Sequence, residues 1–198
     1  MQYSSSDPDP YIDSKTGILK NLLGITTREA LEEAEADITS AIITSTPDDP
    51  PLGDFDLDHL KNIHWELFSA IYSWAGEIRT VEIAKENTRF ANSDSIEMAS
   101  SQLFEKLHSE NLLLLSRDQY VARLAHYYSE INVLHPFREG NGRTERVFFS
   151  QLVAHSGHRL AWERMDADEN LQACVAGYNG DGNLLTSMID RLLERASV

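Results

Sequence analysis

The amino-acid sequence predicts an all-α domain, a helical bundle that carries one β-hairpin. Apolar residues recur at helical spacing through most of the chain, as at Leu60, Ile63 and Leu67. One stretch instead alternates between apolar and polar residues: Val81 and Ile83 precede a turn-like run at 85–88. A length of 198 residues suffices for one domain with a sizeable core.

The helical segments follow one another with few interruptions. We expect helices over 27–43, 57–74, 96–114, 119–131, 146–157 and 184–196, with the hairpin within 77–92. Three prolines and a glycine at 45–54 break the helical pattern and form a connector. We expect this connector to divide the chain into an N-terminal extension with its helix packed on the core, residues 1–50, and a main domain, residues 51–198.

Composition and charge exclude several classes of function. A net charge of −15 argues against nucleic-acid and anionic-membrane binding, because both need a basic surface. The one cysteine, Cys174, excludes an intramolecular disulfide, and no apolar run is long enough to span a bilayer. The N-terminus shows no signal region, so we expect a soluble, cytoplasmic protein. Residues 132–164 nevertheless hold five arginines and three acids, a local basic island.

The run "HPFREGNGRTER" at 135–146 lies in that island and combines unusual residue types. Pro136 cannot continue a helix, so His135 is expected where the preceding helix gives way to a loop. An imidazole with a pKa near 6.5 is suited to take a proton from a hydroxyl. A lone histidine before proline is more often structural, and only its conjunction with the residues that follow favours chemistry.

The second half of the run is suited to a phosphate group. Gly140 and Gly142 allow a tight loop before a helix expected to start near Arg143, and the N–H groups of such a junction bind anions. Arg143 and Arg146 are three residues apart, so both could reach one anion. Glu139 offers a hard oxygen ligand for Mg²⁺ beside a polyphosphate. A solvated ion-pair cluster is the alternative interpretation.

The run resembles the full signature of the Fic family, His-Pro-Phe-x-Asp/Glu-Gly-Asn-Gly-Arg-x-x-Arg, at every defined position. "WAGEIR" at 74–79 is similar to the segment that precedes the family's hairpin flap, and 11–25 is similar to the N-terminal segment of small bacterial Fic toxins. The resemblance implies the Fic fold, a helical bundle with one β-hairpin flap over the active site. It also implies transfer of AMP from ATP, with Mg²⁺, to a Tyr, Ser or Thr hydroxyl of a target protein.

Roles for individual residues follow from the resemblance by position. His135 would be the catalytic base and Glu139 the Mg²⁺ ligand. ATP phosphates would be bound by Arg138, Gly140, Asn141, Gly142, Arg143 and Arg146, with Arg146 on the γ-phosphate. The flap residues Val81, Glu82, Ile83, Ala84 and Lys85 would align the target segment by strand addition. Tyr178 and Asn179 are candidates for the adenine pocket, although packing and a turn explain them equally.

Partners follow from the resemblance too. Many Fic proteins carry an inhibitory helix with the pattern Ser/Thr-x-x-x-Glu-Gly/Asn, and no segment of this chain has it. We therefore expect a small antitoxin that supplies the glutamate, which pairs with Arg146. Type II topoisomerases, DNA gyrase or topoisomerase IV, are the first candidate targets. The alternatives are the Fic domain of a secreted effector, transfer from another nucleotide or phosphate donor, removal of AMP, and a non-catalytic peptide-binding module.

Overall fold

A computed structural model describes residues 4–5, 9–45, 53–85 and 88–196. Its α-helices are α1 (Arg28–Ser45), α2 (Leu57–Phe68), α3 (Ile96–Ser109), α4 (Arg117–Leu134), α5 (Asn141–Ala154), α6 (Ala167–Tyr178) and α7 (Asn183–Leu192). Short 3-10 turns lie at Ser93–Ser95, Leu112–Leu114 and Trp162–Arg164. The prediction of a helical bundle is confirmed.

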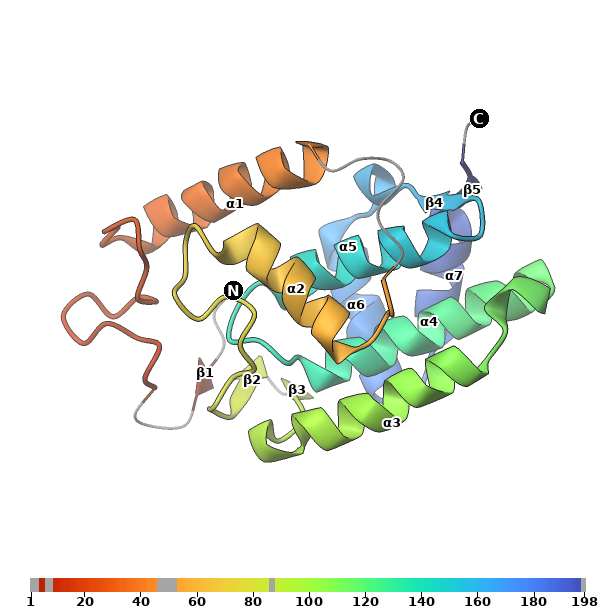
Figure 1. Ribbon diagram of the computed structural model, residues 1–198, viewed down its shortest axis with the longest axis horizontal. Coiled ribbons are helices and arrows are strands. Elements are labelled where there is room, and N and C mark those ends of the chain that lie inside the picture. The colour runs from red at the N-terminus through yellow and green to blue at the C-terminus, as the bar shows by residue number, and fades with distance from the viewer. Residues whose placement is uncertain (1–3, 6–8, 46–52, 86–87, 197–198) are drawn as a thin grey trace.

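Helix α4 is the centre of the bundle and packs against α3, α5, α6 and α7 (Figure 1). It begins with a capping box: the Ser116 side chain accepts from the Gln119 backbone, and the Gln119 side chain accepts from the Ser116 backbone. Its apolar residues are buried on more than one face, as expected for a central helix. The core therefore surrounds the helix whose end carries His135.

Helices α1 and α2 lie over one side of α5 (Figure 1). Asp56 caps α2 by accepting a hydrogen bond from the His59 backbone N–H at 2.8 Å. Helix α1 turns Leu31, Glu35 and Thr39 inward, one residue per turn of the helix. A carboxylate in that buried row needs a partner, and α5 supplies it. The division of the chain at residue 50 stays a prediction.

The strands form two small antiparallel sheets. In the first, of order β1-β2-β3, the flap strands β2 (Ile83–Lys85) and β3 (Thr88–Arg89) are joined by β1 (Ser4–Ser5) from the start of the chain. In the second, β4 (His158–Leu160) pairs with β5 (Leu193–Arg195). The hairpin is thus confirmed, while β1, β4 and β5 were not predicted.

Several elements differ from the sequence prediction. Helix α2 ends at Phe68, because the N–H groups of Ile71 and Tyr72 both bond to the Phe68 carbonyl and turn the chain. Helix α6 was missed, since its small residues give a weak apolar pattern; Asp166 caps it. Residues 193–195 continue the α7 pattern but pair with β4 instead. No described helix is long and apolar enough to cross a membrane.

Candidate active site

The loop between α4 and α5 holds the signature residues in a fixed shape. His135 ends α4 in the left-handed region, at φ 44°, and Gly140 precedes α5 at φ 81°. The Asn141 side chain closes the loop: its Oδ1 accepts from the Phe137 N–H at 2.9 Å and its Nδ2 donates to the Phe137 carbonyl at 2.7 Å. No side chain caps α5, so its first N–H groups have no side-chain acceptor at the N-cap, and a helix start of this kind is suited to an anion.

His135 is held as a neutral base. Its Nδ1 donates to the Asn132 carbonyl at 2.9 Å, which fixes the tautomer and places the lone pair on Nε2. The ring stacks on Phe90 at 3.8 Å between centroids. Burial lowers the pKa of His135 to about 3, against the opposing effect of the Asn132 hydrogen bond. The imidazole is therefore unprotonated at neutral pH and able to accept a proton.

Arg79 joins the flap to the catalytic loop. Its fully buried guanidinium donates to the His135 carbonyl at 2.9 Å, to the Val81 carbonyl at 2.7 Å, and to the Ala91 carbonyl. The Arg79 N–H also donates to the Pro136 carbonyl at 2.9 Å. One side chain thus fixes both ends of the hairpin against the residue proposed as base.

His64 of α2 is hydrogen-bonded to the signature loop. Gly76 N–H donates to its Nδ1 at 2.8 Å, so Nε2 carries the proton and donates to the Glu139 carbonyl at 3.0 Å. The ring stacks on Phe137 at 3.9 Å, and burial lowers the pKa of His64 to about 4. His64 is therefore a neutral structural link between α2 and the signature loop.

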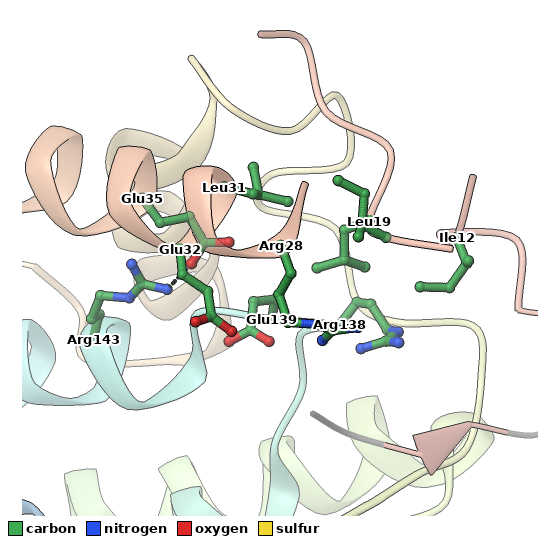
Figure 2. A pocket seen from close by; sticks show the side chains of 10 residues that line it. Ile12, Leu19, Arg28, Leu31, Glu32, Glu35, Arg138, Glu139 and Arg143 are labelled. Carbon is green, nitrogen blue, oxygen red and sulfur yellow. Dashed lines mark hydrogen bonds and ion pairs between the residues drawn. The ribbon is translucent and has the colours of Figure 1, made fainter. Parts of the chain in front are cut away.

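The Glu139 side chain lines a cavity of about 320 Å³ between α1, the N-terminal segment and the signature loop. Figure 2 shows Glu32 and Glu35 descending from α1 toward the loop that carries Arg138 and Glu139. Three arginines, three glutamates and four aliphatic residues line it: Arg28, Arg138, Arg143, Glu32, Glu35, Glu139, Ile12, Ile18, Leu19 and Leu31. Burial, and then the charge of Glu35, raise the pKa of Glu139. A cation beside this carboxylate would relieve that destabilisation of its ionised form.

The two signature arginines that face the N-terminal part of the chain are ion-paired. Arg138 binds the Asp9 carboxylate through Nη2 at 2.8 Å, with both side chains at least 93% buried. Arg143 binds Glu35, which also accepts the Tyr72 hydroxyl, and its guanidinium lies 4.8 Å from the Phe68 ring centroid. Both arginines therefore hold residues 9–45 against the loop, and phosphate binding by them stays a prediction.

Arg146 has electrostatic neighbours that differ from those of Arg143, among them Glu145 and Cys174. Burial raises the pKa of Cys174 in α6 to about 12, a rise that Glu145 reinforces and the positive charges of Lys85 and Arg146 oppose. Lys85 of β2 and Arg146 of α5 thus both influence the pKa of the same residue of α6, Cys174. Within the described residues, no carboxylate comes within 4.0 Å of the Arg146 guanidinium.

The remaining predicted residues are less closely linked to the loop. Val81 and Ile83 are buried, Glu82 accepts hydrogen bonds from Ser93, and Ala84 and Lys85 are half-buried in β2. Asn179 bonds within the end of α6, through Nδ2 to the Val175 carbonyl at 2.9 Å, and Tyr178 is 40% exposed beside it. The described residues contain no cluster of three or more His, Cys, Asp or Glu side chains that could hold a metal ion, and Mg²⁺ binding by Glu139 stays a prediction.

The match to a family model covers residues 54–153 and identifies the Fic/DOC family. The chain belongs to the Fic/DOC family. Among curated relatives, protein adenylyltransferase VbhT of Bartonella schoenbuchensis is 38% identical over all 198 residues, which span only 41% of VbhT. The probable protein adenylyltransferase Fic of Escherichia coli K12 is 38% identical over 189 residues, covering 95% of this chain and 94% of the relative.

Solved Fic structures share the fold. BepC of Bartonella tribocorum, crystallised with AMPPNP, superposes with a TM-score of 0.86 at 25% identity and covers 94% of this chain and 97% of that one. A Fic domain of Bartonella quintana with bound ADP gives 0.86 at 26% identity, covering 94% and 95%. These likenesses extend over the N-terminal segment and the helices beyond the region that the family model matches.

Four buried residues that organise this Fic site were missed from the sequence: Asp9, Glu35, His64 and Arg79. Arg79 lies within the "WAGEIR" run and Glu35 on the inward row of a predicted helix, so each had a local signal. Asp9 and His64 had none, because their partners lie 129 and 75 residues away in the chain.

Proposed function

We propose that this Fic protein is a protein adenylyltransferase that moves AMP from ATP to a Tyr, Ser or Thr hydroxyl of a target protein. The observation that carries the proposal is the state of His135, a buried imidazole with Nδ1 tied to the Asn132 carbonyl and its lone pair on Nε2. A neutral base beside an uncapped helix start is suited to deprotonate a hydroxyl that attacks a phosphate.

The reaction assigns each group a step. The target oxygen attacks the α-phosphorus of ATP, its proton passes to His135 Nε2, and pyrophosphate leaves. The N–H groups at the start of α5 and the guanidinium of Arg146 would donate hydrogen bonds to the phosphate oxygens and stabilise the negative charge that develops on them. Glu139, whose carboxylate faces a cavity with Arg28 and Arg138, would hold Mg²⁺, which neutralises the leaving pyrophosphate.

ATP as the donor is supported by the relatives. BepC was crystallised with the ATP analogue AMPPNP and the Bartonella quintana domain with ADP. VbhT and the Escherichia coli protein are named as adenylyltransferases. The β2 strand would align the target by adding a strand to the flap. The adenine would lie toward α6, where Tyr178 and Asn179 are the first residues to test.

Regulation by a separate protein is part of the proposal. Arg146 has no carboxylate partner among the described residues, and the chain lacks the inhibitory pattern, so a small antitoxin would supply the glutamate. Type II topoisomerase subunits are the first targets to test for such a toxin. Co-expression with the antitoxin should restore growth and yield a complex, whereas unchanged toxicity would contradict this pairing.

The test of the activity is transfer of label from α-labelled ATP to proteins of a bacterial lysate with Mg²⁺. The wild type should label a discrete target, and His135→Ala should abolish the band. His155→Ala is the matched control, since His155 is exposed at the end of α5 and should leave labelling unchanged. Label from γ-labelled ATP or from another nucleotide alone would overturn adenylyl transfer in favour of a different donor.

A further inference from the structure

The cavity beside Glu139 is lined by three arginines, and two of them are paired with carboxylates of the N-terminal part of the chain. Arg138 pairs with Asp9 at 2.8 Å, and both side chains are buried. Arg143 pairs with Glu35, and this pair too is largely buried. A ligand could take either guanidinium only by leaving a buried carboxylate without its counter-ion, which is costly. These two arginines are therefore poorly placed to bind an anion in the cavity.

Arg28 is the third arginine of the cavity, and it has no such partner among the residues that the structure describes. It is the first residue of α1 and lines the cavity together with Glu139. Figure 2 shows its side chain extending from α1 toward Glu139 and Arg138. No described carboxylate lies within 4.0 Å of its guanidinium, although Glu32 follows one turn later on the same face of the helix. Arg28 is half-buried, so a ligand in the cavity can reach it.

The place of Arg28 in α1 is unfavourable for the helix itself. The peptide dipoles of a helix add up to partial positive charge at its N-terminus, and this charge repels a cation in the first turn. The next residue, Glu29, is of the type that stabilises a first turn. The helix therefore gains no stability from the charge of Arg28, whereas an anion in the cavity would be stabilised by it.

The proposed reaction brings one anion to this part of the site, the pyrophosphate part of ATP. Glu139 would hold Mg²⁺ here, and Mg²⁺ in such sites is bound by one or two carboxylates together with the substrate phosphates. Arg146, assigned to the γ-phosphate, reaches back to the first turn of α5, because a Cβ on Gly142 would lie 3.4 Å from its Nη1. The volume of about 320 Å³ is within the range of small-molecule sites.

We propose that Arg28 binds the pyrophosphate part of ATP and stabilises it as it leaves. The inference rests on the proposed adenylyl transfer and adds a phosphate ligand that lies outside the signature and outside the matched residues 54–153. The target oxygen bonds to the α-phosphorus, its proton passes to His135 Nε2, and the bond from that phosphorus to the β-phosphate oxygen breaks. Negative charge then accumulates on pyrophosphate, whose oxygens accept paired hydrogen bonds from the guanidinium.

The test is nucleotide binding by the purified full chain, measured by calorimetry without a target protein. Arg28→Ala should weaken the binding of AMPPNP about 10- to 100-fold, because hydrogen bonds between charged groups are lost. Binding of AMP, which lacks the pyrophosphate part, should be unchanged. Arg28→Lys keeps the charge without the planar fork, so its affinity for AMPPNP should fall between those of wild type and Arg28→Ala.

Arg195→Ala is the matched control. It removes one exposed positive charge from β5 and leaves the lining of the cavity intact, so it accounts for the change in net charge. Its affinity for AMPPNP should equal that of wild type. Equal weakening of AMP and AMPPNP binding by Arg28→Ala would show a general loosening of the site and would overturn the inference. Equal losses of AMPPNP affinity in Arg28→Ala and Arg195→Ala would overturn it too.

The labelling reaction with lysate proteins separates this inference from the proposed function. AMPPNP bound equally well by wild type and Arg28→Ala, with lysate proteins labelled from α-labelled ATP, would overturn the role of Arg28 and leave adenylyl transfer standing. Failure of the wild type to bind AMPPNP, with no label on lysate proteins from any nucleotide donor, would overturn the proposed function and the inference with it.

Discussion

Glu35 of α1 and Arg143 of α5 form an ion pair inside the protein, 108 residues apart in the chain. The glutamate side chain is 7% exposed and the arginine side chain 22%. Tyr72 donates its hydroxyl to the second carboxylate oxygen, so both oxygens of Glu35 have partners. The pair fastens α1 to the first turn of the helix that carries the signature, next to Glu139.

Removal of the Glu35 side chain should therefore weaken the attachment of α1 to α5 and lower the free energy of unfolding. Glu35→Ala leaves the Arg143 guanidinium without its counter-ion and the Tyr72 hydroxyl without its acceptor. Breaking such a pair costs about 3 kcal/mol of unfolding free energy, measurable by urea denaturation. Glu33→Ala, an exposed residue on the same helix, is the matched control and should change stability little. Equal effects of the two substitutions would contradict a structural role for the pair.

The helices of this fold could be predicted because their apolar periodicity is local. Residues 119–131 were read as a helix ending before Pro136, and α4 does end at Leu134. The signature loop was predicted for the same reason, since its glycines and proline determine its shape locally. In contrast, β5 continues the apolar pattern of α7, and only its pairing with β4 shows that it is a strand.

The buried polar partners of the site could not be predicted in that way. Arg138 and Arg143 were assigned to phosphate from their place in the signature. Their ion pairs with Asp9 and Glu35 depend on how distant segments pack. The sequence predicts which chemical groups form the site, whereas the ion pairs of Arg138 and Arg143 are seen only in the folded chain.

Gly140 is required both for its positive φ and for the close approach of Phe68. Comparison of Gly140→Ala with Gly180→Ala separates the two effects. The φ of Gly140 is 81°, and a Cβ there would lie 2.5 Å from the Phe68 ring, which is fully buried. Gly140→Ala should cost about 2–5 kcal/mol from backbone strain and overpacking together. Gly180→Ala has the same strain, at φ 91°, with no atom within 4 Å, and should cost only about 1–2 kcal/mol. Thermal unfolding of both variants gives the difference, and equal losses would exclude the clash.

The two buried histidines should make the protein sensitive to mild acid. The pKa of His64 is lowered to about 4 and that of His135 to about 3, both by burial. Unfolded histidines titrate near 6.5, so below that pH the unfolded state binds protons that the folded state does not, and stability falls. At pH 5 each histidine should cost about 2 kcal/mol relative to pH 7.

His135→Asn isolates one of these contributions. Asparagine tolerates the left-handed conformation of this position but does not titrate. Urea unfolding at pH 7 and pH 5 should show a loss smaller by about 2 kcal/mol in the variant than in wild type. The same loss in both proteins would mean that His135 is protonated in the folded state at pH 5.

Glu145 should have the opposite effect from the histidines, because it should lower the stability of the fold as pH rises. Its carboxylate is buried between α5 and the core, and among the described residues Oε1 has no hydrogen-bond partner. Burial raises the pKa of Glu145 well above its usual range, despite the charge of Arg146. The neutral form therefore stabilises the fold at low pH, and this contribution is lost as pH rises through the folded pKa.

Replacement by a neutral residue of the same shape should remove that pH dependence. Glu145→Gln should gain stability relative to wild type as pH rises from 5 to 9, because wild type must either ionise a buried carboxyl or keep it protonated at increasing cost. Glu66→Gln makes the same change on the exposed face of α2 and should show no such trend. Thermal unfolding across this pH range measures both, and parallel curves for Glu145→Gln and wild type would show that Glu145 ionises normally in the folded protein.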